Sequence, residues 1–213
     1  VVLDLRDNLG GNNWNWFLEW WAPAPWQGMT IDVRLDKHLG KVWSRNLKRY
    51  TNRSWKTRIQ WYVDQLRVAP PGQRFSGKRP LFCGEKSCRV SNRYTPRKRL
   101  VTVPVALLTG PLCSSSCDNF ARIYAEHRFG PLVGTSPDAG ATIQRFRHFV
   151  RWGRSSLGYL RLALSREYSG RTGKRNEGRL VPVDHRVERT PANRKRYSKL
   201  LVGRAIQGLG TFR

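Results

Sequence analysis

The sequence contains few acidic residues and no long hydrophobic run. It has 14 Asp and Glu against 40 Lys and Arg, a formal net charge of +26. No stretch of about 18 consecutive apolar residues is present, so no transmembrane helix is predicted. The first residues also lack a charged segment followed by an apolar one, so no signal peptide is visible. The chain has no initial Met and opens on an apolar strand pattern, Val1–Leu5, so we interpret it as N-terminally incomplete.

The excess of positive charge predicts contact with anionic partners. A surface of this charge attracts nucleic acid through counterion release, and it equally favours an anionic membrane surface or another polyanion. Apart from Arg6, the basic residues are spread from Arg34 to Arg213 and form no single stripe or tail. This dispersion weakens the case for a specific nucleic-acid interface.

Length and composition predict one globular domain. The 213 residues are enough for one core, and 39% of them are hydrophobic, including nine Trp. Residues 69–104 are rich in Pro, Gly, Arg and Lys, and we expect them to form an insertion or a long ordered loop. The single predicted domain therefore covers residues 1–213 with a basic insertion.

Local patterns predict alternating strands and helices. Val1–Leu5 and the apolar segment Leu100–Thr109 are typical of buried strands in a layered α/β core, and Leu132–Gly134 indicates another strand. Helical spacing of apolar residues marks four segments: 14–21, 41–67 with a break near 51–52, 118–127, and 194–209. Two further strands are expected over residues 142–152 and 157–164, around a Gly- and Ser-rich turn.

Four cysteines occur as two close pairs, Cys83 with Cys88 and Cys113 with Cys117. Four cysteines allow three connectivities. The spacings are not those of a usual zinc site, and local disulfides in an exported protein are the favoured alternative to ordinary thiols. A pair at i and i+4 in a helix has a Cα separation of about 6 Å, within disulfide range.

Three consecutive serines lie between a predicted strand and a predicted helix, in the segment GPLCSSSCD. A small-residue turn at this place lifts a hydroxyl out of the sheet, and the first N–H groups of the helix can stabilise an oxyanion. A Ser before a helix is also a common N-cap. The turn by itself therefore allows either a nucleophile or a cap.

Two motifs together resemble the C-terminal processing (tail-specific) serine protease family. The opening LDLRDNLGGN is similar to the family's strand-and-turn signature, and about a hundred residues later LLTGPLCSSSCDNFA resembles its nucleophile segment. The segments PLVGT and EGRLVPVD resemble the family's next strand and its closing segment. The resemblance covers most of the chain apart from residues 20–100. It implies an α/β, crotonase-like or ClpP-like core of layered sheet and helices.

The resemblance assigns roles to individual residues. It places Ser115 at the nucleophile position, aligned on Asp118. It implies an oxyanion hole made by the backbone N–H of Ser116 together with one from the Gly10-Gly11 turn. No cofactor or metal is implied.

The catalytic base is the point at which the sequence departs from the better-known members. Those enzymes pair the Ser with a downstream Lys, whereas the aligned position here is Gly140, and no Lys occurs between Lys98 and Lys174. A second branch resembles the tricorn core protease and uses a His that precedes the LDLR strand. In that branch a Glu near the closing segment helps to orient the catalytic residues. Glu177 is placed to fill this role. His127 lies about 18 Å from Ser115 along a continuous helix, too far for a direct bond.

The leading hypothesis is a serine peptidase that cleaves peptide bonds through an acyl-enzyme on Ser115. The first alternative is a catalytically dead pseudoenzyme that binds peptides. The second is a basic module that binds polyanions. Cysteine pairing and the family resemblance favour an exported, periplasmic or extracellular, location.

Overall fold

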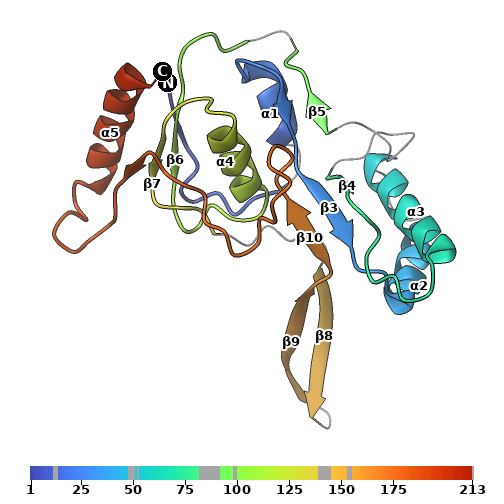
Figure 1. Ribbon diagram of the computed structural model, residues 1–213. Coiled ribbons are helices and arrows are strands. Elements are labelled where there is room, and N and C mark those ends of the chain that lie inside the picture. Colours follow the sequence, from blue (N-terminus) through green and yellow to red (C-terminus); the bar gives the residue numbers. More distant parts are fainter. Residues whose placement is uncertain are drawn as a thin grey trace. The chain divides into compact units, whose positions relative to one another are not determined.

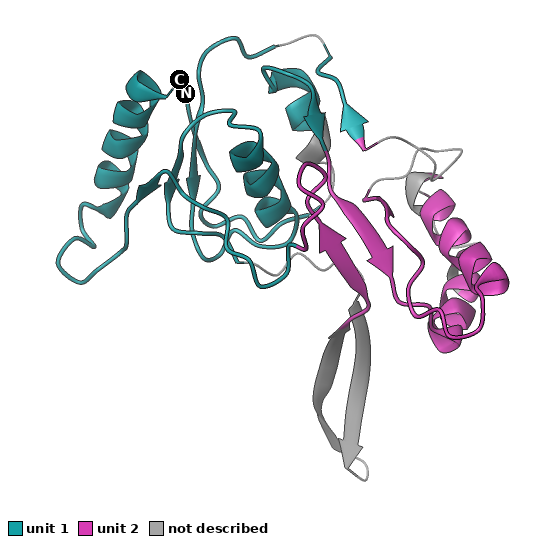
Figure 2. Cartoon of the chain, viewed as in Figure 1, with its two compact units in different colours: residues 1–27, 93–141, 176–213 teal, residues 28–92, 142–175 magenta. Residues whose placement is uncertain are grey.

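The computed structural model divides into two compact units (Figures 1 and 2). Unit 1 comprises residues 1–27, 93–141 and 176–213, and unit 2 comprises residues 28–92 and 142–175. The structure describes residues 1–11, 14–47, 51, 53–81, 92–97, 100–138, 145–152 and 155–212.

Unit 1 is built on a four-stranded parallel sheet in the order β1-β6-β7-β11. The strands are β1 (Val2–Asp4), β6 (Ala106–Thr109), β7 (Leu132–Gly134) and β11 (His185–Arg186). Every residue of β6 and β7 is buried, as expected for strands covered on both faces. Register pairs such as Leu3 with Leu107 and Leu108 with Val133 align the carboxyl ends of β1, β6 and β7. The turns that follow β1 and β6 therefore leave the sheet at the same edge.

Helices cover this sheet. Helix α5 (Tyr197–Thr211) packs Leu201 and Ala205 against β6 and β7, and Figure 1 shows α4 (Ser116–Glu126) on the other side of the sheet. Helix α1 (Trp14–Trp21) lies against α4, where the ring of Trp21 stacks on that of Tyr124 at a centroid distance of 5.4 Å. A small antiparallel pair, β2 (Trp26–Gln27) and β5 (Arg93–Tyr94), completes the unit. The α/β fold with a parallel sheet is confirmed.

Unit 2 contains an antiparallel sheet in the order β10-β3-β4 and a helical pair. The strands are β10 (Ser165–Tyr168), β3 (Thr30–Val33) and β4 (Arg79–Pro80), and the helices are α2 (Lys37–Asn46) and α3 (Arg53–Val68). Asp36 caps α2 by accepting a hydrogen bond from the Leu39 N–H, 2.9 Å away. Strands β8 (Arg145–Trp152) and β9 (Ser155–Ala163) pair antiparallel with a register shift after Val150.

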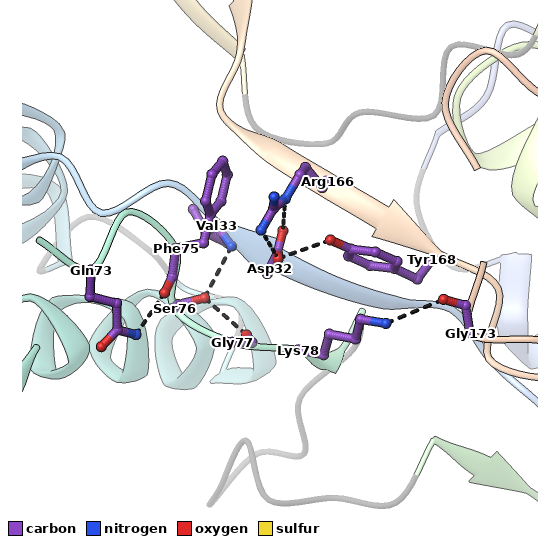
Figure 3. Close-up of polar contacts among 10 residues, drawn as sticks. All are labelled: Asp32, Val33, Gln73, Phe75, Ser76, Gly77, Lys78, Arg166, Tyr168 and Gly173. Atoms are coloured by element: carbon purple, nitrogen blue, oxygen red, sulfur yellow. Dashed lines mark hydrogen bonds and ion pairs between the residues drawn. The ribbon is translucent and has the colours of Figure 1, made fainter. Parts of the chain in front are cut away.

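A polar cluster joins β3 to β10 and to the segment before β4 (Figure 3). The Arg166 guanidinium donates to both carboxylate oxygens of the buried Asp32, at 2.9 and 2.5 Å, and the Tyr168 hydroxyl donates to the same carboxylate at 3.0 Å. The guanidinium also lies over the Phe75 ring. The Val33 N–H donates to Ser76 Oγ at 3.0 Å. Arg166 and Tyr168 pair with the buried Asp32 carboxylate, so this cluster links strands β3 and β10 of unit 2.

The predicted helices are all present, including the break between α2 and α3. The strand predicted over Leu100–Thr109 is shorter, because only Ala106–Thr109 joins the sheet. Pro104 has no N–H for a ladder, and Leu100 instead donates to the carbonyl of Trp20 in α1. Among the described residues, no helix is both long and apolar enough to cross a membrane.

Candidate active site

Ser115 occupies a strained turn between β6 and α4. It is the N-cap of α4, with φ 58° and ψ −120°, and its side chain makes no capping hydrogen bond. A residue with a Cβ avoids this positive-φ conformation, and its occurrence in an ordered strand-to-helix turn is typical of an exposed nucleophile. The hydroxyl is thus held at the end of a helix dipole without the usual capping role. The Ser115 side chain therefore does not cap the helix, and its role as a nucleophile stays a prediction.

The turn after β1 lies directly against the serine turn. The Ser114 N–H donates to the carbonyl of Asn8 at 3.1 Å, and the Ser114 hydroxyl donates to the carbonyl of Leu9 at 3.2 Å. Gly10 has φ +92°, and a Cβ built on it would lie 2.7 Å from Ser114 O and 2.8 Å from Ser115 Cβ. Only a glycine allows the two turns to approach this closely.

The predicted oxyanion donors are partly engaged within the structure. The Gly10 N–H donates to Asn8 Oδ1 at 2.8 Å, and the Gly11 N–H donates to Ser116 Oγ at 2.6 Å. Ser116 is the first residue of α4, where backbone N–H groups have no partner inside the helix. The assignment of Gly10, Gly11 and Ser116 to an oxyanion hole stays a prediction.

Cys113 and Cys117 form a disulfide that brackets Ser115, with a Cα separation of 5.2 Å. Both residues are buried. The bridge closes the serine turn onto the first turn of α4, which restricts the strained backbone between its two ends. The other predicted pair, Cys83 and Cys88, lies outside the described residues, as does Gly140.

A buried ion pair lies on α4 immediately after the serine turn. Asp118 is completely buried, and within the described part of the chain neither of its carboxylate oxygens has a hydrogen bond. Arg122 Nη2 is 3.7 Å from Asp118 Oδ2. Burial raises the pKa of Asp118 to about 6, Arg122 opposes this shift, and the charge of Asp138 adds to it.

Glu177 lies in a turn of unit 1 next to α4. The turn is closed by the Arg179 N–H donating to Asn176 O at 3.0 Å. Arg122 Nη2 donates to the Arg179 carbonyl at 2.7 Å, so the turn is tied to the helix that begins after Ser115. Glu177 itself is half-buried. Its role as the acid that orients the machinery stays a prediction.

Two of the four histidines, His127 and His185, have defined neighbours in unit 1. His127 Nε2 accepts a hydrogen bond from the Gln27 N–H at 3.1 Å, which gives this side chain a structural role at the C-terminus of α4. His185 lies on β11 beside Gly208 of α5. Across the described residues, no group of three or more His, Cys, Asp or Glu could hold a metal ion.

Sequence reasoning missed two contributors to this site. The Asn8 carbonyl accepts a hydrogen bond from Ser114 in the serine turn, and its side chain accepts one from Gly10 within its own turn. Asp118 and Arg122 form the buried pair on α4. An Asp and an Arg at i and i+4, on a helix whose neighbouring positions are apolar, are a visible signal for such a pair.

The fold and this arrangement define the class of protein: an α/β core of the ClpP or crotonase type, with a serine turn beside a glycine turn. The chain belongs to peptidase family S41, whose family model matches residues 1–184. Family S41 is a family of serine peptidases. No curated protein matches the sequence.

Solved structures share the fold at low sequence identity. Mature CPAF complexed with lactacystin is 15% identical with a TM-score of 0.67, and mature CPAF alone is 17% identical with the same TM-score. Both matches cover 99% of this chain and 44% of CPAF. A candidate peptidase from Parabacteroides merdae is 14% identical with a TM-score of 0.59, over 98% of this chain and 51% of that protein. The chain therefore spans about half or less of the length of these relatives.

Proposed function

We propose that the protein contributes the nucleophile and oxyanion hole of a serine peptidase, with Ser115 as the nucleophile. The observation that carries the proposal is the strained backbone of Ser115 at the N-terminus of α4, held against the Gly10 turn. A purely structural cap has no need of this conformation, since a cap residue has β-region φ and ψ and bonds the helix N–H groups. Membership of family S41 supports peptides or proteins as the substrate class.

In this proposal the Ser115 hydroxyl attacks the carbonyl carbon of a peptide bond. The Oγ–C bond forms, the serine proton passes to a base, and the charge that develops on the carbonyl oxygen is stabilised by backbone N–H groups of Ser116 and of the glycine turn. The C–N bond then breaks and the amine departs with the proton. Water cleaves the resulting ester and restores Ser115. The Gly11 N–H, which donates to Ser116 Oγ, would exchange that acceptor for the oxyanion.

The base that accepts the serine proton is not assigned to a residue of this chain. The position of the family's Lys is Gly140, so the Ser–Lys dyad is absent. We place Glu177 as the acid that orients the base, because its turn is bonded to α4 through Arg122. A local disulfide around the nucleophile supports an exported location, since such bridges persist in oxidising compartments.

A fluorophosphonate probe tests the proposal, because it forms a covalent bond only with an activated serine. We expect labelling of the protein, mapped by mass spectrometry to Ser115 and abolished by Ser115→Ala. Ser114→Ala, which changes the neighbouring hydroxyl, is the matched control and should retain labelling. Labelling that survives Ser115→Ala contradicts the assignment. Peptide binding without any labelling indicates the pseudoenzyme instead.

A second candidate function, polyanion binding, is favoured by the segment before α5. Arg194, Lys195 and Arg196 are consecutive and exposed. Asn193 holds their turn, because its Oδ1 accepts from the Thr190 N–H at 2.9 Å and its Nδ2 donates to the Glu188 carbonyl at 2.8 Å. Three cations are thereby presented together on an ordered turn, which suits a chain of phosphates or sulfates.

A further inference from the structure

The buried pair Asp118 and Arg122 leaves hydrogen-bonding groups unused among the described residues. Asp118 is completely buried and Arg122 is 6% exposed. The two groups are 3.7 Å apart, beyond a direct hydrogen bond, and among the described residues neither Asp118 oxygen nor Arg122 Nε has a hydrogen-bond partner. A buried ion pair with such gaps is often less stable than apolar residues of the same volume. An incompletely hydrogen-bonded pair beside a candidate nucleophile points to a functional role.

The pair connects two parts of the candidate site. Asp118 and Arg122 are four residues apart on one face of α4, the helix that begins directly after Ser115. Arg122 Nη2 donates to the backbone carbonyl of Arg179 at 2.7 Å. The guanidinium therefore lies between the carboxylate of α4 and the turn that carries Glu177.

The Glu177 turn is held by hydrogen bonds to its surroundings and within itself. Residues 176–181 contain no helix or regular strand. Besides the bond from Arg122, the turn is held by its own Arg179 N–H to Asn176 O bond and by the Val181 N–H donating to Ser136 Oγ at 2.9 Å. Arg122 provides a side-chain link from the serine helix to this turn.

We infer that Asp118 and Arg122 are positioning residues that fix the Glu177 turn against α4, the helix that begins directly after Ser115. This inference rests on the proposed function, because only a peptidase would need Glu177 in a fixed place. Whether the two residues hold the turn in place can be measured independently of any activity. Ionised Asp118 keeps the guanidinium oriented, and the guanidinium holds the Arg179 carbonyl. The charged groups that face Asp118 are Arg122 on the same helix and Asp138 on the segment after β7.

Hydrogen exchange of the backbone amides, resolved by peptide, tests the placement without any need for activity. In Arg122→Gln we expect residues 176–181 to exchange about tenfold faster, because one hydrogen bond of about 1.4 kcal/mol is lost. Residues 106–109 of β6 should keep their protection, which shows that the core remains folded. Arg204→Gln, an exposed arginine on α5, is the matched control and should leave both regions unchanged. Unchanged exchange of residues 176–181 in Arg122→Gln overturns the inference.

The rate of Ser115 labelling supplies a second readout. We expect labelling to slow about tenfold in Arg122→Gln and to recover in part in Arg122→Lys, which keeps a cation beside Asp118. Asp118→Asn should remove a step near pH 6 from the rate profile of the wild type. Equal rates and profiles in all variants overturn the positioning role. If the wild type is not labelled at all, the proposed function fails, and the exchange experiment still decides the placement of the turn.

Discussion

Gly10 is the residue at which the two turns of the candidate site constrain each other most closely. Its φ of +92° disfavours any side chain, and an added Cβ would lie 2.8 Å from Ser115 Cβ. We expect Gly10→Ala to lower the free energy of unfolding by about 1–3 kcal/mol, because the backbone conformation is strained and two turns must separate. Urea denaturation followed by Trp fluorescence measures the change. Labelling of Ser115 should be lost in the same variant.

Gly203 provides the control for this substitution. It lies inside α5, and a Cβ built on it meets no atom within 4 Å. Gly203→Ala should therefore raise the free energy of unfolding by up to about 1 kcal/mol, through the better helix propensity of Ala. A Gly10→Ala variant that is as stable as Gly203→Ala would show that the two turns are not in contact.

Asp118 gives the protein a pH-dependent component of stability. Its pKa is raised from 3.8 to about 6, so folding favours the protonated form. The contribution is fully favourable below pH 3.8 and is lost as the pH rises to about 6. Relative to Asp118→Asn, which cannot ionise, the wild type should lose up to about 3 kcal/mol of unfolding free energy across this window. Urea denaturation of both proteins at pH 4, 5, 6 and 7 measures the difference.

The comparison with Asp118→Asn separates the pH-dependent stability that arises from Asp118 from the contributions of the other acidic residues. Asp4 has a pKa lowered by its hydrogen bond with Arg6, so its effect on stability has the opposite sign and is common to both proteins. A difference between the two proteins that is constant from pH 4 to pH 7 would contradict the raised pKa of Asp118.

At the scale of elements, the sequence predicts the local structure well and the long-range pairing poorly. The apolar spacing in α1, α2, α3 and α4 is a local property and indicates each helix. The pairing of β3 with β10 joins residues more than 130 positions apart, and no local periodicity contains that information. The same limit applies to the site: the serine turn is visible as a motif, but the contact of Asn8 with Ser114 is not.

The disulfide between Cys113 and Cys117 stabilises the segment that begins α4. It closes a loop with a sequence separation of four residues. The chain-entropy relation gives about 2 kcal/mol for a loop of this size. Reduction should therefore lower the free energy of unfolding by about 2 kcal/mol, as measured by urea denaturation with and without a reductant. The loosened turn should also slow the labelling of Ser115.

A double variant, Cys113→Ser with Cys117→Ser, distinguishes this bridge from the other cysteines. It keeps Cys83 and Cys88, so any response to reductant that it retains arises from that pair. The expected result is a smaller response than that of the wild type. An equal response in both proteins would mean that the bridge around Ser115 adds no stability.

At the scale of the whole molecule, each compact unit is assembled from segments that are not contiguous in the sequence. Unit 1 takes three segments and unit 2 takes two. This interleaving hides the division from composition, since apolar strands of one unit follow helices of the other along the chain. The positive charge is present in both units, with the consecutive cations of residues 194–196 in unit 1 and the basic stripe of Lys37, Lys41 and Arg45 on α2 in unit 2.

Salt titration of heparin binding tests the polyanion function and its location. The logarithm of the binding constant should fall linearly with the logarithm of salt concentration, as expected for counterion release. Replacing Arg194, Lys195 and Arg196 by Glu should reduce the affinity and flatten the slope. The same replacement of Lys37, Lys41 and Arg45 removes an equal charge from α2 and serves as the control. Equal effects of the two triple variants would contradict a specific role of the 194–196 turn.

The left-handed backbone of Ser115 affects which amino acids can replace this serine. Glycine adopts φ 58° without strain, so a turn maintained only for folding would be more stable with glycine at this position. The chain uses glycine at the facing position and keeps a hydroxyl here. Under the proposed function, stability and reactivity therefore favour different residues at position 115. Variants of this protein selected for heat resistance alone would then be expected to lose the serine first.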